Sequence, residues 1–293
     1  MTRVEKQGKI ILVVAIIVIA GAVAGGGAYI YVTDHPGTVT LDVSIASSLT
    51  NVAEYMAPTF DQQHNCQINF NIGGSSALES QIASGFPCQV FMSANPKWTS
   101  VLNSSNDIYD NNVSSFCTNT LIVILPKDNP KNITTLLQLA QPGIRIDVCN
   151  FTVPAGEYTQ DFLNNVNSTW GNSSSSAYIP AYAGYANTFM NNIKSYELTD
   201  EAVVSNIVND VGNYDAAIAY VSDAIFDFGL FQTIPINATV NQIGTYAMGI
   251  TTVNHISTAQ LAVAYDFVDF WLTASGQTLL RSFGFGNLTA TFV

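Results

Sequence analysis

Apolar positions along this chain switch repeatedly between the spacing of strands and the spacing of helices. The segment 40–46 (TLDVSIA) is apolar, rich in β-branched residues and bounded by turn residues, which is typical of a buried strand. Between positions 49 and 60 the apolar residues recur every three to four residues, which predicts a helix that Pro58 should kink or end early. Segments 68–72 (INFNI) and 88–94 (CQVFMSA) predict two more strands.

The stretch 71–87 (NIGGSSALESQIASGFP) passes from a strand through two glycines and two serines into a helical pattern. Ser76 and Glu79 have the spacing of a capping box, and Leu78 and Ile82 would lie on one apolar face behind it. This part of the chain therefore predicts a strand that ends in a Gly-Ser corner, directly at the start of a helix.

A second series of apolar segments follows. Strands are predicted at 120–126 (TLIVILP), 144–148 (IRIDV), 215–224 (DAAIAYVSDA) and 245–253 (TYAMGITTV), and helices at 157–166, at 201–211 and twice within 257–285. The last two helices are expected to break near Gly276. Alternating strands and helices imply right-handed crossovers, so the sequence predicts an α/β fold of mostly parallel sheet with helices on both faces.

The N-terminal region differs from the rest of the chain. Residues 10–32 carry no charge and are long enough, at 1.5 Å per residue, to cross a hydrocarbon core of about 30 Å. We expect a basic cytoplasmic segment 1–9, a transmembrane helix over 10–32 and a linker over 33–37, with the remainder exported. A cleaved signal peptide is the competing interpretation, because AGAVAGGGA within this region is rich in small residues. With the anchor retained, the protein would sit in the cell membrane and face the extracellular side.

Positive charge is scarce in the exported part. The chain has 9 Lys and Arg residues against 21 Asp and Glu, a formal net charge of −12. Three of the basic residues precede position 10, so too few remain to form the basic patch that binds a nucleic acid. We therefore expect no nucleic-acid partner, and any bound anion must be held by neutral groups.

Glycosylation sequons are frequent, as expected for an exported chain. The acceptor residues are Asn103, Asn112, Asn132, Asn150, Asn167, Asn172, Asn237 and Asn287. Their density predicts a glycosylated exterior, although an Asn-, Ser- and Thr-rich chain also produces sequons by chance.

The cysteines leave two interpretations open. There are four, at Cys66, Cys88, Cys117 and Cys149. An even number in an oxidising compartment is compatible with two disulfides, for which three connectivities exist. Buried free thiols are the alternative.

Four polar corners follow predicted strands and open predicted helices. They are Ser47 with Ser48, Ser75 with Ser76, the segment 153–159 (VPAGEYT) and the segment 199–203 (TDEAV). Ligands of open α/β sheets bind at the carboxyl ends of parallel strands, where these corners would lie. Each helix start offers unpaired N–H groups and the positive end of a helix dipole, so together the corners favour an anion. Each corner alone is equally compatible with ordinary helix capping.

The ordered series of motifs resembles one known family. The chain is similar to the molybdate-binding proteins of ABC importers, and the match spans residues 40–286. The motifs that carry the resemblance are, in this order, ASSLTNV, GGSSALESQIASGFPCQVFMSANPKW, VPAGEYT, AYVSDA and FW…GQTLLRSFGF. The resemblance implies a two-lobed periplasmic-binding-protein type II fold. Lobe one would combine 38–120 with 252–293, lobe two would be 121–251, and 120–126 and 245–253 would cross between them.

The same resemblance implies a ligand and a site. The ligand would be molybdate or tungstate, with no cofactor, no metal ion held directly by the chain and no enzymatic activity, and an ABC permease would be the protein partner. The site would use the hydroxyls of Ser48, Ser75 and Tyr220 and the N–H groups of Ala155 and Ala202, with Ser76 as the register neighbour of Ser75.

Two positions qualify this assignment. Archaeal tungstate-binding relatives carry a carboxylate where Ala202 aligns, which expands the coordination of the bound metal. Alanine lacks that group, so the resemblance favours simple tetrahedral binding here. Glu157 lies near the expected pocket, and its charge would repel an anion unless the side chain points away or is protonated.

Other functions remain as alternatives. Sulfate or another tetrahedral oxyanion is the nearest of them, and a glycosylated adhesion protein is another. A serine hydrolase has weak support, because GGSSA carries Ala77 where the nucleophile motif has its last glycine, and the chain has only three histidines.

Overall fold

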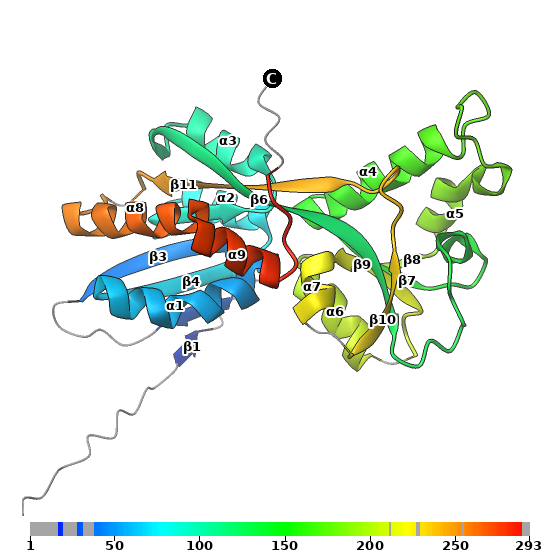
Figure 1. The fold of residues 1–293 in the computed structure, drawn as a ribbon, viewed down its shortest axis with the longest axis horizontal. Helices are drawn as coiled ribbons and strands as arrows, with labels where there is room; N and C mark the ends of the chain where they lie inside the picture. The colour runs from blue at the N-terminus through cyan, green and yellow to red at the C-terminus, as the bar shows by residue number, and fades with distance from the viewer. Residues whose placement is uncertain are drawn as a thin grey trace, which may run out of the picture.

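The described strands form a single sheet that passes through two hydrophobic cores. The computed structural model describes residues 17–19, 28–31, 38–210, 212–226, 229–253 and 255–288. Within them the strand order is β1-β2-β4-β3-β5-β11-β6-β9-β7-β8, and β10 pairs with β6 outside this path. We call the two parts of the chain built around these cores lobe one and lobe two (Figure 1).

Lobe one has a parallel centre. Its strands β3 (Val39–Ala46), β4 (Cys66–Gly73) and β5 (Val90–Ser93) are parallel, with β3 in the middle. The helices are α1 (Thr50–His64), α2 (Ser75–Ala83), α3 (Pro96–Ser104), α8 (Thr258–Leu272) and α9 (Ala274–Ser282). Fully buried large side chains such as Trp271 and Phe267 fill the core, because apolar burial is the main stabilising term of folding.

Lobe two repeats this arrangement. Strands β7 (Ile146–Cys149), β8 (Ile193–Glu197) and β9 (Ala216–Tyr220) are parallel, and β10 is Phe231–Pro235. The helices are α4 (Pro154–Thr169), α5 (Tyr185–Asn191), α6 (Asp200–Asn209) and α7 (Val221–Phe226), with short 3-10 turns at Leu136–Ala140 and Pro180–Tyr182. Strand and helix therefore alternate through most of both lobes, as the apolar pattern predicts.

Two long strands connect the lobes. β6 (Ile108–Pro126) and β11 (Ile243–Thr251) pair with each other in antiparallel orientation. β11 also pairs with β5 of lobe one, and β6 pairs with β9 and β10 of lobe two, so both strands run between the cores (Figure 1). The boundaries expected from the sequence, at 120/121 and 251/252, stay a prediction.

The predicted transmembrane helix over 10–32 is wrong. No helix among the described residues has the length and apolar character needed to span a bilayer. Within this region the described residues form two short strands, β1 (Ile17–Ile19) and β2 (Ala28–Tyr31), and β2 pairs with β4. These strands consist mostly of Ile, Val and Tyr, which favour extended backbone. The rest of 10–32, together with the expected segments 1–9 and 33–37, lies outside the described residues.

One predicted helix end is wrong, and one predicted break between helices is present. α1 continues through Pro58 to His64, because Met56 and Phe60 are buried on its inner face while the ring of Pro58 is exposed to solvent. α8 and α9 break at Thr273, three residues before Gly276. Gly276 lies in the first turn of α9, where a Cβ atom would come within 2.1 Å of the carbonyl oxygen of Phe270.

Of the two interpretations of the cysteines, the structure shows free thiols rather than disulfides. All four are free and buried in the structure. Burial raises the pKa of the Cys88 thiol to about 12, so this side chain behaves as a small apolar group of the core.

Candidate functional site

A pocket lies between the two lobes where several strands end and helices begin. It has a volume of about 230 Å³ when the space at its mouth is included. Its walls are Ala46, Ser47, Ser48, Gly73, Gly74, Ser75 and Ala94 from lobe one, and Cys149, Val153, Pro154, Ala155, Leu198, Thr199, Asp200 and Tyr220 from lobe two. The pocket lies where β3, β4, β5, β7 and β9 end, at the carboxyl ends of the parallel strands of both lobes.

Two of the predicted serines lie in the lobe-one wall. Ser48 follows β3, and its Oγ is 2.8 Å from the hydroxyl of Tyr246. Ser75 follows β4, and its Oγ accepts a hydrogen bond of 3.1 Å from the N–H of Ala94. The Oγ–H of Ser75 therefore remains available as a donor.

The first turns behind these serines have no side-chain cap. The 3-10 turn Ser47–Leu49 that leads into α1 lacks one, and so does α2, whose N-cap is Gly74. The predicted capping box of Ser76 and Glu79 is therefore wrong, since Ser76 already lies inside the helix. Uncapped N–H groups next to a pocket favour an anionic ligand.

The lobe-two wall contains Ala155 and Tyr220. Ala155 lies in the first turn of α4, whose N-cap Val153 makes no side-chain cap bond. Gly156 lets this turn approach β7 closely, since a Cβ there would come within 1.9 Å of the carbonyl oxygen of Asn150. The Tyr220 hydroxyl is buried without a hydrogen-bond partner, and burial raises its pKa well above the usual value. It therefore stays protonated and can donate a hydrogen bond into the pocket.

The other two predicted residues are not in the walls. Ser76 lines a neighbouring hollow with Thr152 and Leu198. The N–H of Ala202 donates to Oγ1 of Thr199 at 3.2 Å, the N-cap bond of α6, so a helix cap already uses it. The role of these two residues in a ligand site stays a prediction.

Asp200 is the wall residue that the sequence interpretation missed. Its carboxyl accepts a hydrogen bond at Oδ1 from the Ser47 hydroxyl, while Oδ2 is buried without a partner. Burial, followed by the negative charges of Glu201 and Asp223, raises its pKa well above the usual range. In the sequence, an acid at the start of a helix is explained equally well by the helix dipole, so its position carried no distinct signal of a site.

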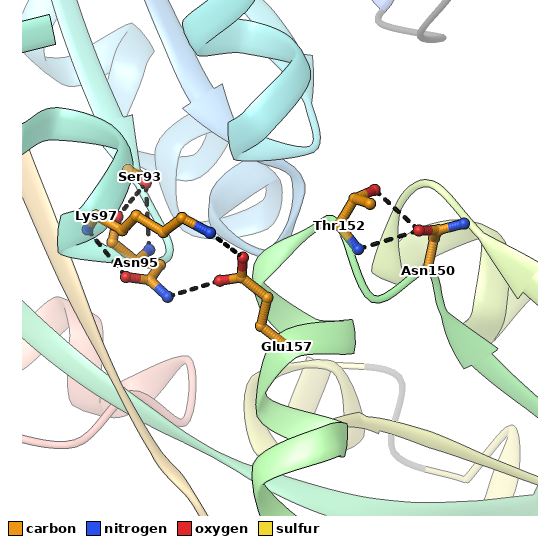
Figure 2. Close-up of polar contacts among 6 residues, drawn as sticks. All are labelled: Ser93, Asn95, Lys97, Asn150, Thr152 and Glu157. Atoms are coloured by element: carbon orange, nitrogen blue, oxygen red, sulfur yellow. Dashed lines mark hydrogen bonds and ion pairs between the residues drawn. The ribbon is translucent and has the colours of Figure 1, made fainter. Parts of the chain in front are cut away.

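Glu157 points away from the pocket and contacts lobe one. Its Oε1 accepts from Nζ of Lys97 at 2.6 Å, and its Oε2 accepts from Nδ2 of Asn95 at 3.0 Å. Figure 2 shows Lys97 and Asn95, at the start of α3, both reaching the Glu157 side chain on the first turn of α4. The ion pair neutralises the carboxylate, which removes the repulsion expected for a bound anion.

Further contacts join the lobes around the pocket. The Tyr158 hydroxyl donates to the carbonyl oxygen of Ala94 at 3.0 Å, and the Thr50 hydroxyl donates to Oε1 of Glu201 at 3.0 Å. Together with the bonds made by Ser47 and Lys97, these contacts hold the two lobes against each other. We call this arrangement, with the two lobes in contact, the closed form.

The chemistry of the walls is neutral or acidic. Among the described residues that line the pocket there is no Lys, Arg or His. Within the described part of the chain, no group of three or more His, Cys, Asp and Glu residues is placed to hold a metal ion. Hydroxyl groups, helix N–H groups and one carboxyl are the groups that a ligand would meet.

Comparison with known proteins shows what the chain is similar to. The family described as bacterial extracellular solute-binding proteins matches residues 41–286. A molybdate-binding protein of Mycobacterium bovis is 25% identical over 254 residues, which cover 86% of each chain.

Two solved structures have the same fold. The periplasmic molybdate-binding protein of Azotobacter vinelandii gives a TM-score of 0.66 at 18% identity, covering 84% of this chain and 98% of that one. The sulfate-binding protein of Mycobacterium tuberculosis gives a TM-score of 0.69 at 16% identity, covering 86% and 88%. They confirm the predicted two-lobed α/β fold of periplasmic-binding proteins.

Proposed function

Because this chain belongs to the bacterial extracellular solute-binding proteins, we propose that its pocket captures a tetrahedral oxyanion, molybdate or tungstate, and that the protein delivers it to an ABC permease. The family is one of solute-binding proteins, which agrees with the expectation that the chain is not an enzyme. The ligand would be held between the lobes by neutral donors.

The unpartnered hydroxyl of Tyr220 carries this proposal. A buried hydroxyl without a hydrogen-bond partner costs about 1–3 kcal/mol, which a ligand oxygen at that position would recover. The same pocket is lined by Ser48, by Ser75 and by the uncapped first turns of α2 and α4. A buried dianion needs several such donors, because desolvation without hydrogen bonds would cost far more than binding returns.

The relatives support molybdate as the ligand. The Mycobacterium bovis protein that aligns with 86% of this chain is named a molybdate-binding protein. Sulfate has the same shape and charge, so it is tested as a competitor. The hydrolase alternative lacks support, since the Ser75 hydroxyl contacts the N–H of Ala94 rather than a base, and no histidine lines the pocket.

We also propose that the exported surface is glycosylated. Six of the eight sequon asparagines are exposed to solvent: Asn112, Asn132, Asn167, Asn172, Asn237 and Asn287. Mass spectrometry of the protein from its native host, before and after enzymatic deglycosylation, tests this directly.

The proposed function is tested by thermal unfolding of the full chain with and without oxyanions. A ligand present at a hundred times its dissociation constant should raise the free energy of unfolding by about 2.7 kcal/mol, which shifts Tm by several degrees. We expect this shift with molybdate and tungstate and none with sulfate or phosphate. A shift with sulfate alone would make the protein a sulfate receptor, and no shift with any oxyanion would refute the proposal.

The contact between Lys97 and Glu157 should favour the closed form. Lys97→Ala is expected to raise the dissociation constant for molybdate about two- to fivefold, because a partly exposed ion pair contributes up to about 1 kcal/mol. The effect should shrink in high salt. Lys194→Ala is the matched control, since Lys194 bonds to Asn213 and lies over the ring of Tyr214, both within lobe two. Equal affinities of the wild type and Lys97→Ala at low salt would contradict the prediction.

A further inference from the structure

The carboxyl of Asp200 is an unexpected group in a pocket proposed to bind a dianion. The residue is only 4% exposed. The Ser47 hydroxyl donates to Oδ1, whereas Oδ2 is buried without a protein partner, and Asp200 is one of the residues of the pocket wall. An ionised carboxylate at this position would repel a dianion, because like charges at close range inside a protein interact strongly.

The hydrogen bond from Ser47 and the start of α6 favour the ionised form of Asp200, but burial outweighs them. Among the described residues no positively charged side chain faces Asp200. The titratable groups that face it are Glu201 on α6, Asp223 on α7, Cys149 at the end of β7, Tyr220 on β9 and Tyr246 on β11. All of them are either neutral or acidic. The negative charge of a bound dianion would therefore make the ionised form of Asp200 still less favourable.

We propose that Asp200 is a specificity-determining residue that binds the oxyanion in its protonated form, with the Oδ2–H donated to a ligand oxygen. Oδ1 is then the carbonyl oxygen that accepts from Ser47, and Oδ2 is the hydroxyl, so both oxygens are satisfied once the ligand is bound. This inference rests on the proposed function. The Oδ2–H group of Asp200 favours a fully deprotonated tetrahedral dianion. The O–H group of a protonated ligand at this position would point its hydrogen at another hydrogen-bond donor.

Binding is then coupled to proton uptake. When the lobes separate, the Asp200 carboxyl meets water and ionises near its usual pKa of about 3.9. Closure around an anion above that pH transfers one proton from the solvent to Oδ2. The pKa in the bound form is the raised one, so affinity is greatest at acidic pH and falls as pH increases. Between the pKa of Asp200 in the open form and its pKa in the bound form, the affinity falls by up to about tenfold per pH unit. Above the higher of these two pKa values the affinity no longer changes with pH.

The test uses the full chain and dilute molybdate between pH 5.5 and 8.5, where the ligand stays a dianion. Isothermal calorimetry gives the dissociation constant at each pH. Repeating it in two buffers of different ionisation enthalpy gives the number of protons taken up. We expect the wild-type dissociation constant to rise by up to about tenfold per pH unit, with about one proton taken up per anion at neutral pH.

Asp200→Asn is the decisive variant, because its amide places a permanent N–H donor where Oδ2–H lies and keeps an acceptor for Ser47. We expect it to bind with an affinity that changes less than about twofold across the pH range, and more tightly than the wild type at pH 8.5. Asp210→Asn is the matched control at the exposed end of the same helix, and it should keep the wild-type pH dependence.

Several outcomes would overturn the inference. A wild-type affinity that does not change with pH excludes coupled proton uptake, whether or not the variant folds. A variant that retains the wild-type pH dependence excludes Asp200 as its source. A folded Asp200→Asn protein that binds weakly at every pH would mean that the ligand needs the carboxylate itself. Absence of binding by the wild type at every pH would instead refute the proposed function, and this inference with it.

Discussion

Ser48→Ala combined with Ser75→Ala is expected to weaken molybdate binding by about a thousandfold. Each hydroxyl would donate to a charged ligand, and such a hydrogen bond is worth about 1.5–3 kcal/mol. Two of them are worth about 3–6 kcal/mol, and a thousandfold corresponds to about 4 kcal/mol within this range. The free energy of unfolding should change little, because among the described residues each hydroxyl has a single hydrogen-bond partner, the N–H of Ala94 for Ser75 and the hydroxyl of Tyr246 for Ser48.

Calorimetric titration with molybdate measures the affinity of the double variant, and thermal unfolding without ligand confirms its fold. The matched control is Ser100→Ala with Ser104→Ala, two exposed serines of α3 whose hydroxyls bond only to their own helix. If the double variant at Ser48 and Ser75 binds molybdate as tightly as this control, the site is located incorrectly.

Gly156→Ala is expected to destabilise the protein by about 3 kcal/mol and to weaken ligand binding. The new Cβ would lie within 1.9 Å of the carbonyl oxygen of Asn150 and 2.6 Å of that of Cys149, and backbone atoms cannot move aside cheaply. Relief of the clash must displace the first turn of α4, which contains Ala155 of the pocket wall.

Urea denaturation gives the change in free energy of unfolding, and titration with molybdate gives the change in affinity. Ser168→Ala, an exposed position near the other end of α4, should leave both quantities close to those of the wild type. A Gly156→Ala protein of normal stability and normal affinity would mean that the first turn of α4 has no role in closing the pocket.

The prediction of the strands succeeded in two different patterns. Segment 120–126 is almost continuously apolar, as expected for a strand buried on both faces. Segments 40–46 and 68–72 alternate apolar with polar residues, with the period of two that a strand has. The prediction failed for 10–32, because length and apolar character do not distinguish a membrane helix from β-branched residues in strands such as Ile17–Ile19.

The structure brings four of the predicted site residues together, and their role in binding a ligand stays a prediction. Ser48, Ser75, Ala155 and Tyr220 all lie in the pocket walls. Ser76 and Ala202 lie outside the walls, because one or two residues of helix register decide which residue at the start of a helix reaches the pocket. Local spacing does not contain that information.

The sequence by itself determined the alternation of strand and helix, the polar corners at the ends of the strands and the scarcity of positive charge. These follow from local properties: apolar period, turn chemistry and composition. Only the tertiary structure decided that Glu157 is neutralised by Lys97 and that Asp200 lies in the pocket wall with one oxygen unpartnered. Both outcomes depend on two lobes meeting across residues that are 60 and 153 positions apart in the chain. Such contacts, and the burial that sets the protonation of Asp200, exist only once the chain has folded.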